Sequence, residues 1–243
     1  VYIFTYSGSS WDAGTKIMAS DKAASDQLGA SVAISGDGTT VIASANGEDA
    51  AATDAGAVYL YTYSGGSWGS EVKFVAPDGQ TSDRLGENGV SINSDGTKFI
   101  VGAKQEDGDA GGSGVGAAYI FTYSGSSWDT GTKIVAPDAE ASDHFGNGVY
   151  MSSDGTKVIV GADLEDTGGT DAGAAYIFTY SGSSWDTGTK IVAPDAEAGD
   201  NFGGGYFGGV TMNSDGTKVI VAAMQEDTGA TGTGAVYVFD YRA

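Results

Sequence analysis

The sequence predicts an all-β fold, a β-propeller of four blades with four antiparallel strands in each. A unit of about 60 residues recurs four times. Every unit contains four short segments that are rich in β-branched or aromatic residues and bounded by glycine, serine and aspartate. The aromatic segment is apolar on both faces, and such a sheet needs neighbours on both sides, as a propeller blade has. We therefore expect the 243 residues to form one domain.

The aromatic strand marks the repeat most clearly. A tyrosine is its second residue, and successive copies lie 57 to 61 residues apart, at Tyr2, Tyr59, Tyr119, Tyr176 and Tyr237. Segments 116–146 and 173–203 are identical at 29 of 31 positions. This places the repeats at 1–57, 58–117, 118–174 and 175–235, with a surplus terminal strand at 236–241.

Within one repeat the four strands are expected at 147–152, 157–162, 174–180 and 189–193. A Ser-Asp-Gly-Thr segment, or a close variant of it, joins the first two strands as a tight hairpin, because Asp-Gly readily adopts the positive φ of such turns. The aspartates of these turns are therefore expected to shape hairpins: Asp37, Asp95, Asp154 and Asp215.

The strand count predicts how the ring closes. The chain supplies seventeen strands, whereas a closed ring of four blades needs sixteen. We expect the N- and C-terminal strands to close the ring. The surplus apolar strand then frays, adds to an edge or pairs with another molecule, which would lead to self-association. The chain begins without methionine and inside a repeat, which indicates a mature form or a piece of a longer protein.

Composition excludes several kinds of function. The chain has no cysteine and a single histidine, His144, so disulfides, thiolate metal sites and multi-histidine sites are excluded. A net charge of −21 argues against nucleic acid and anionic membranes as partners. No apolar run is long enough for membrane insertion. We expect no enzyme activity, because four near-equal copies of one pattern are unlike an active site.

Several short motifs recur in a fixed order in each unit. Phe-Gly occurs at 145–146 and 202–203, with Leu-Gly at 28–29 and 85–86; Val-Gly-Ala follows at 101–103 and 160–162, and Gly-Ala-Val-Tyr occurs at 56–59 and 234–237. In this order the chain resembles the FG-GAP repeats of integrin α-subunit propellers and of related bacterial and algal proteins. The resemblance implies an extracellular or cell-surface location and a role in adhesion. The calcium loop of that family is not matched, since one carboxylate remains in each turn and a lysine follows it in three of them.

Acidic residues are concentrated in the loops that should share one face of the propeller. The loops between strands four and one and between strands two and three hold 22 of the 32 acidic residues, whereas eight carboxylates and seven lysines are expected on the opposite face. By the resemblance, the acidic face is the ligand-binding face. Two motifs recur there, Asp-x4-Asp and Glu-Asp, and the candidate residues are Asp78, Asp83, Asp138, Asp143, Asp195 and Asp200, with Glu106, Asp107, Glu165, Asp166, Glu226 and Asp227. They could form a ring of calcium or cationic-ligand sites, or cap turns through backbone N–H groups.

Aromatic residues suggest a second kind of site. A tryptophan begins the fourth strand of each unit, at Trp11, Trp68, Trp128 and Trp185. These rings could stack on sugars, or pack against the neighbouring blade. One repeat also carries an insert with Tyr206 and Phe207, which would bulge near the central channel. These two residues are candidates for a unique contact, or the loop merely fills the channel.

Taken together, these features predict a non-catalytic extracellular module for adhesion or surface assembly. Its partner would be a protein or a glycan at a surface. The alternative is a lectin with four quasi-equivalent sites.

Overall fold

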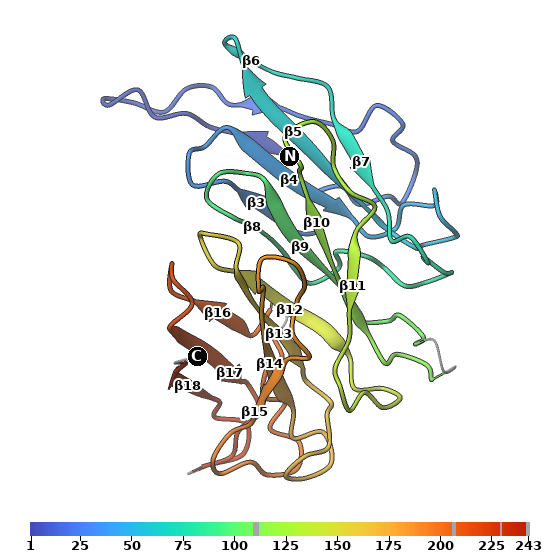
Figure 1. Cartoon of the computed structure of the whole chain (residues 1–243), viewed down its shortest axis with the longest axis vertical. Coiled ribbons are helices and arrows are strands. Elements are labelled where there is room, and N and C mark those ends of the chain that lie inside the picture. Colours follow the sequence, from blue (N-terminus) through green and yellow to red (C-terminus); the bar gives the residue numbers. More distant parts are fainter. Residues whose placement is uncertain (109–111, 206–207, 229, 242–243) are drawn as a thin grey trace.

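The computed structural model describes residues 1–108, 112–205, 208–228 and 230–241, and confirms the predicted all-β fold. The described residues form strands and no helix. The sheets follow one another in chain order, from the N-terminal end in blue to the C-terminal end in red (Figure 1). Within the described residues no helix is long and apolar enough to span a membrane.

Three complete blades form the middle of the molecule. The first blade contains β3 (Val32–Ile34), β4 (Thr40–Ala45), β5 (Ala57–Ser64) and β7 (Val72–Phe74), and β6 (Ser67–Trp68) extends its outer hairpin. The second contains β8 (Val90–Ile92), β9 (Lys98–Ala103), β10 (Ala117–Thr122) and β11 (Thr132–Ile134). The third contains β12 (Phe145–Met151), β13 (Lys157–Ala162), β14 (Ala174–Thr179) and β15 (Thr189–Ile191).

An incomplete sheet stands at each end. The N-terminal hairpin consists of β1 (Tyr2–Ile3) and β2 (Thr15–Lys16), which correspond to strands three and four of a blade. The C-terminal sheet consists of β16 (Val210–Met212), β17 (Lys218–Ala223) and β18 (Ala235–Asp240), which correspond to strands one to three.

The hairpins between strands one and two form as their sequence predicts. In the third blade Oδ1 of Asp154 accepts hydrogen bonds from the Ser152 hydroxyl at 2.6 Å and from the Thr156 N–H at 2.9 Å. Gly155 follows with a φ of +67°. The aspartate therefore holds the turn together, and glycine supplies the left-handed backbone that the turn requires.

Adjacent blades are joined at the Phe-Gly motif. Phe145 is fully buried, and its N–H donates to the carbonyl of Val115 in the preceding blade at 3.0 Å. Phe202 makes the same bond to Ala172 at 2.9 Å, and Leu85 bonds to Ala55 at 2.8 Å. One apolar side chain and one backbone hydrogen bond thus fix each blade against the next.

The core consists of these interfaces between blades. Strands two and three of the complete blades are buried on both faces, as predicted for sheets with neighbours on either side. Between the second and third blades, for example, Ile100 and Ile120 pack in one cluster with Val158 and Tyr176. Burying each such side chain contributes about 1.5–3 kcal/mol.

This structure does not confirm the predicted closure of the ring. The innermost strands of successive sheets contact one another, β3 with β8, β8 with β12 and β12 with β16. No comparable contact in the described part of the chain joins the C-terminal sheet to the N-terminal hairpin or to β3. The hairpin covers the outer strands of the first blade, and the C-terminal sheet lies at the other end of the array (Figure 1). The surplus strand three is therefore retained at both ends, as β1 and as β18.

Candidate functional site

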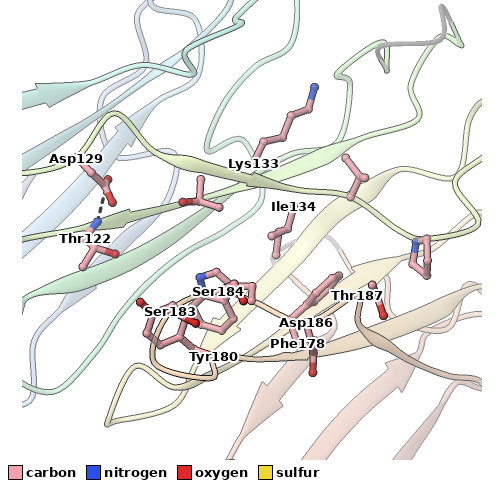
Figure 2. A pocket seen from close by; sticks show the side chains of 14 residues that line it. Thr122, Asp129, Lys133, Ile134, Phe178, Tyr180, Ser183, Ser184, Asp186 and Thr187 are labelled. Atoms are coloured by element: carbon pink, nitrogen blue, oxygen red, sulfur yellow. Dashed lines mark hydrogen bonds between the residues drawn. The ribbon is translucent and has the colours of Figure 1, made fainter.

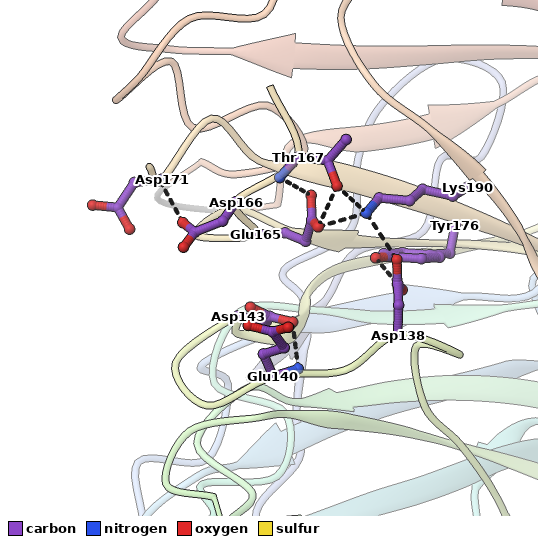
Figure 3. Close-up of polar contacts among 9 residues, drawn as sticks. All are labelled: Asp138, Glu140, Asp143, Glu165, Asp166, Thr167, Asp171, Tyr176 and Lys190. Atoms are coloured by element: carbon purple, nitrogen blue, oxygen red, sulfur yellow. Dashed lines mark hydrogen bonds and ion pairs between the residues drawn. The ribbon is translucent and has the colours of Figure 1, made fainter. Parts of the chain in front are cut away.

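The acidic loops of the third blade converge on one lysine (Figure 3). Lys190 on β15 donates to Asp138 at 2.9 Å and also to Glu165, while the hydroxyl of Tyr176 on β14 donates to Asp138 at 2.8 Å. Burial disfavours the charged form of Asp138, but the hydrogen bonds from Lys190 and Tyr176 prevail and lower its pKa. Burial acts against the charge of Lys190 as well, yet the two carboxylates raise its pKa. The chain thus supplies its own cation to these carboxylates.

The same network recurs in the other complete blades. Lys133 bonds to Asp78 at 2.7 Å and to Glu106 at 2.9 Å, and Tyr119 bonds to Asp78 at 2.7 Å. In the first blade, Asp21 accepts from both Lys73 and Tyr59 at 2.8 Å, and Lys73 also contacts Glu48. We call this arrangement the lysine–carboxylate network: a tyrosine on strand three, a lysine on strand four, and an aspartate and a glutamate from the two acidic loops.

The network corrects the predicted distribution of charge. The lysines of strand four were expected on the face opposite to the acidic loops. In the structure Lys133 and Lys190 contact those loops, because each pairs with the strand-three tyrosine across the sheet and its long side chain extends to the acidic end. Three of the acidic clusters are therefore partly neutralised from within.

Other carboxylates of the acidic loops cap turns. The second aspartate of Asp-x4-Asp accepts a backbone N–H three residues earlier, at 2.7 Å for Asp143 and 2.8 Å for Asp200. The aspartate of Glu-Asp accepts a later N–H, as in Asp166, which accepts from Asp171 at 2.9 Å. The equivalents Asp83, Asp107 and Asp227 accept from Gln80, Gly114 and Gly232. In both motifs an aspartate thus stabilises a turn of its own loop by accepting a backbone hydrogen bond.

Two of these capping aspartates have a pKa above the ordinary value of an aspartate. Burial raises the pKa of Asp83 and of Asp143 to about 6, and the nearby carboxylates add to the effect. In each, the capping N–H acts in the opposite direction but does not outweigh burial.

Calcium does not fit the residues present. The hairpin aspartates are engaged by the hydroxyl and N–H groups of their own turns. In the acidic loops of the third blade, Asp138, Asp143 and Glu165 are engaged by lysine, tyrosine or backbone donors. Among the residues that the structure describes, no group of three or more histidine, cysteine or acidic side chains is arranged to hold a metal ion.

A hollow lies on the acidic face. It has a volume of about 280 Å³ and is lined by Asp138, Glu140, Asp143, Glu165, Asp166 and Thr167. Figure 3 shows these loops facing one another, with Lys190 on one side. The side chains of Glu140 and Asp166 belong to exposed residues and do not contact the lysine. The hollow therefore has an excess of negative charge.

Grooves between blades form a second candidate site, at the tryptophan end of the sheets. The groove between the second and third blades has a volume of about 610 Å³, and its lining includes Trp185, Tyr180, Asp129 and Thr122. Figure 2 shows Asp129 accepting from the Thr122 N–H at 3.1 Å beside the serines of the next hairpin. Similar grooves of about 580 and 540 Å³ contain Trp68 and Trp128.

The tryptophans do not begin strand four as predicted; they lie in the hairpin before it. Each pairs with the last tyrosine of strand three, and the ring centroids of Tyr180 and Trp185 are 5.3 Å apart. Trp128 also packs edge-on against Phe74 of the preceding blade. Trp11, in the N-terminal hairpin, is 66% exposed. The tryptophan rings therefore pack against neighbouring aromatic side chains and also line the grooves.

Sequence reasoning missed the lysines and tyrosines of the network. A signal was available, since Thr-Lys-Ile recurs at 15–17, 132–134 and 189–191. The last two of these segments follow a repeated acidic loop after one tyrosine strand. The predicted contact of Tyr206 and Phe207 lies outside the described residues.

Comparison with known proteins identifies the repeat. The model of the FG-GAP repeat matches four times, at residues 11–61, 68–121, 128–178 and 185–239. No match was found among curated proteins. Among solved structures, the Dos1 propeller has a TM-score of 0.52 and 17% identity over 88% of this chain and 44% of its own. A putative TolB from Agrobacterium tumefaciens has a TM-score of 0.50 and 16% identity, over 98% of this chain and 70% of its own.

These likenesses show the fold alone, and the chain spans less than half the length of the first of the two structures. The family model, in contrast, covers most of the chain and coincides with the repeats, the Phe-Gly junctions and the four-stranded sheets described above. The chain is a β-propeller protein of the FG-GAP repeat family.

Proposed function

We propose that the chain is a non-catalytic binding module of an extracellular or cell-surface protein, and that it acts in adhesion or surface assembly. FG-GAP repeats are typical of extracellular proteins. The acidic loop face would contact a partner protein that presents cationic side chains. The observation that carries the proposal is the hollow between the acidic loops of the third blade, where Glu140 and Asp166 add negative charge beyond what Lys190 neutralises.

The chemistry of the hollow favours recognition over catalysis. Four of its carboxylates, those of Asp138, Asp143, Glu165 and Asp166, are tied to lysine, tyrosine or backbone donors. The lysine–carboxylate network occurs in three blades. A volume of about 280 Å³ accommodates a side chain such as lysine or arginine, and complementary charge would increase the rate of association at low salt.

The test is the binding of an oligolysine peptide to the chain and to two charge-matched variants. The Glu140→Gln/Asp166→Asn variant removes two charges at the hollow, whereas Asp129→Asn/Asp186→Asn removes two from the tryptophan end. The asparagines keep an acceptor for the backbone N–H groups that these aspartates bind.

We expect at least about fivefold weaker binding in the first variant and unchanged binding in the second, in 50 mM salt. Equal weakening in both would mean that only net charge matters and would reject the proposed site.

A lectin is the second candidate, because the grooves repeat an aromatic pair beside hydroxyl and carboxylate groups. The Trp185–Tyr180 pair and Asp129 lie in the largest of them. Tryptophan faces stack well on sugar rings, and polar neighbours provide hydrogen bonds. Glycan-array binding that is lost in Trp185→Ala, while the variant keeps its thermal melt, would support this function. An array without any signal would reject it.

A further inference from the structure

An asparagine is followed directly by glycine at three places in the chain, Asn46-Gly47, Asn88-Gly89 and Asn147-Gly148. An asparagine in this setting can lose its side-chain amide to the backbone, because glycine has no Cβ atom to hinder the approach of its own nitrogen to the asparagine side chain. In a folded chain the glycine N–H must be free to give up its proton, and water must reach the asparagine. The three pairs differ in both respects.

The pair in the second blade has a free glycine N–H. Across the sheet from Gly89, the carbonyl of Gly102 accepts from Gly86 at 2.8 Å, while the N–H of Gly102 donates to the Gly89 carbonyl at 3.2 Å. The N–H of Gly89 itself donates to no acceptor in the described part of the chain. Asn88 is half-buried, so water reaches it without any opening of the sheet.

The other two asparagines are protected by the fold. Asn46 is 6% exposed, and the N–H of Gly47 donates to the Asp26 carbonyl at 3.3 Å. Asn147 lies within β12 and is 2% exposed. The next sheet covers that position closely, since a Cβ atom on Gly148 would lie 2.9 Å from the nitrogen of Gly209.

The side chain of Asn88 also takes part in a contact between blades. Its amide donates to the side-chain oxygen of Asn147, and β8, which Asn88 precedes by two residues, contacts β12. A chemical change at residue 88 therefore acts directly on the junction of the second and third blades.

We propose that Asn88 is a site of spontaneous deamidation in the folded chain, where it converts to aspartate and isoaspartate while Asn46 and Asn147 stay intact, and that this conversion loosens the contact between the second and third blades. The proposal goes beyond the binding function, because it concerns a modification that the chain undergoes without a partner or an enzyme.

The reaction needs only water. The nitrogen of Gly89 loses its proton to solvent and attacks the Cγ atom of Asn88. The new bond from nitrogen to Cγ closes a succinimide ring, the bond from Cγ to Nδ2 breaks, and the amide nitrogen takes up a proton and leaves as ammonia. Water then opens the ring, giving aspartate when it cleaves the bond at Cγ and isoaspartate when it cleaves the bond at the backbone carbonyl of residue 88. In total one water is consumed and one ammonia is released.

Either product removes the hydrogen bond to Asn147. A carboxylate at residue 88 is an acceptor only, so it faces the side-chain oxygen of Asn147 without a proton to donate. Because Asn147 is buried, its oxygen loses this donor at a cost in stability. Isoaspartate in addition lengthens the backbone by one methylene group just before β8.

The test follows the three asparagines in one sample. The chain is incubated in a mildly alkaline buffer, folded or unfolded in urea, and digested at intervals, and the mass of each of the three peptides reports its deamidated fraction. Unfolded chain is the matched control, because there all three asparagines are followed by glycine and none is protected.

We expect Asn88 to react at least about tenfold faster than Asn46 and Asn147 in the folded chain, because the other two must first open locally, and all three to react at similar rates in urea. Equal rates in the folded chain, or an unreactive Asn88, would overturn the proposal. A preference for Asn88 that persists in urea would show that the neighbouring sequence, and not the fold, selects this site, and would overturn it as well.

A second measurement tests the effect on the junction. Asn88→Gln keeps an amide but reacts far more slowly, since its ring would need one more atom. After the same incubation the unmodified chain should melt at a lower temperature than before, whereas Asn88→Gln should keep its melting temperature and freshly prepared Asn88→Asp should resemble the incubated chain. Equal losses in the unmodified chain and Asn88→Gln would reject the proposed loosening. Neither Glu140 nor Asp166 takes part, so these outcomes are independent of oligolysine binding.

Discussion

At the scale of single residues, the acidic loops are organised around lysines that the chain itself provides. Lys190 has a side chain that is only 21% exposed and lies between Asp138 and Glu165. Removing one member of such a cluster leaves the other charges partly buried without a partner, which costs more than an exposed ion pair contributes.

Lys190→Met should therefore destabilise the fold by about 2 kcal/mol at neutral pH. The loss should shrink in high salt, which screens the repulsion between the remaining carboxylates. Lys16→Met is the matched control, because Lys16 occupies the same repeat position but contacts no carboxylate in the described part of one copy. Chemical denaturation at low protein concentration measures both. Equal effects would show that the lysine stem, and not its charge, is what matters.

The raised pKa values of Asp83 and Asp143 predict how stability depends on pH. A carboxyl group whose pKa is about 6 when folded keeps its proton more readily in the folded state. Its contribution to stability is present below pH 4 and is lost as the pH rises through 6. Asp143→Asn should remove this loss while it keeps an acceptor for the Glu140 N–H.

Thermal melts from pH 4 to pH 7 should thus show the variant gaining stability relative to the unmodified chain. Asp154→Asn should show the opposite trend in a lower window, from pH 2 to about pH 4, since hydrogen bonds from Ser152 and Thr156 outweigh burial and lower the pKa of Asp154 below the ordinary value of 3.8. A constant difference between Asp143→Asn and the unmodified chain at all pH values would contradict the raised pKa.

At the scale of elements, the junction between blades depends on close backbone contact. Gly173 has a φ of +85°, and a Cβ atom there would lie 2.2 Å from the carbonyl oxygen of Phe202 in the next sheet. Gly182 has a similar φ of +94° but has no atom within 4 Å of such a Cβ. The two glycines therefore share one backbone requirement and differ only in the space around them.

Gly173→Ala should cost at least about 2 kcal/mol more than Gly182→Ala. The difference isolates the clash at the junction from the strain of a left-handed backbone, and urea denaturation of the two variants measures it. Similar losses of stability would mean that the junction can move apart at little cost.

The elements were predicted well where local chemistry decides them. Strand Lys157–Ala162 has its predicted bounds, and the Asp-Gly turns form, because hydrogen bonds within a few residues determine both. Strand four is shorter than expected, and Trp185 lies before it, because the tryptophan pairs with Tyr180 inside the hairpin.

At the scale of the whole molecule, many of the carboxylates behind the net charge of −21 already have a partner within the chain. The carboxylates around Lys73, Lys133 and Lys190 have a cation, and the capping aspartates have backbone donors. Added salt should stabilise the chain by general screening rather than by binding at specific positions.

Calcium should therefore raise the melting temperature no more than magnesium chloride of equal concentration, and calorimetry should show no saturable heat. Any ligand that binds only the folded state would raise its stability in proportion to its concentration and affinity. A saturable calcium signal that a chelator reverses would show that loop carboxylates release their present partners to form a site.

The sequence by itself determined the four-fold repeat, the all-β blades, the turns and the FG-GAP family, because these depend on contacts within one repeat and on residues such as Phe145 that recur at fixed spacing. Only the tertiary structure decided which charges meet. Three strands, β12 to β14, lie between Asp138 and Lys190 in the chain, and the contact of these two residues depends on how the strands and loops pack together. The open array was likewise beyond sequence reasoning, because strand counting specifies what a closed ring requires but not whether its two ends come together.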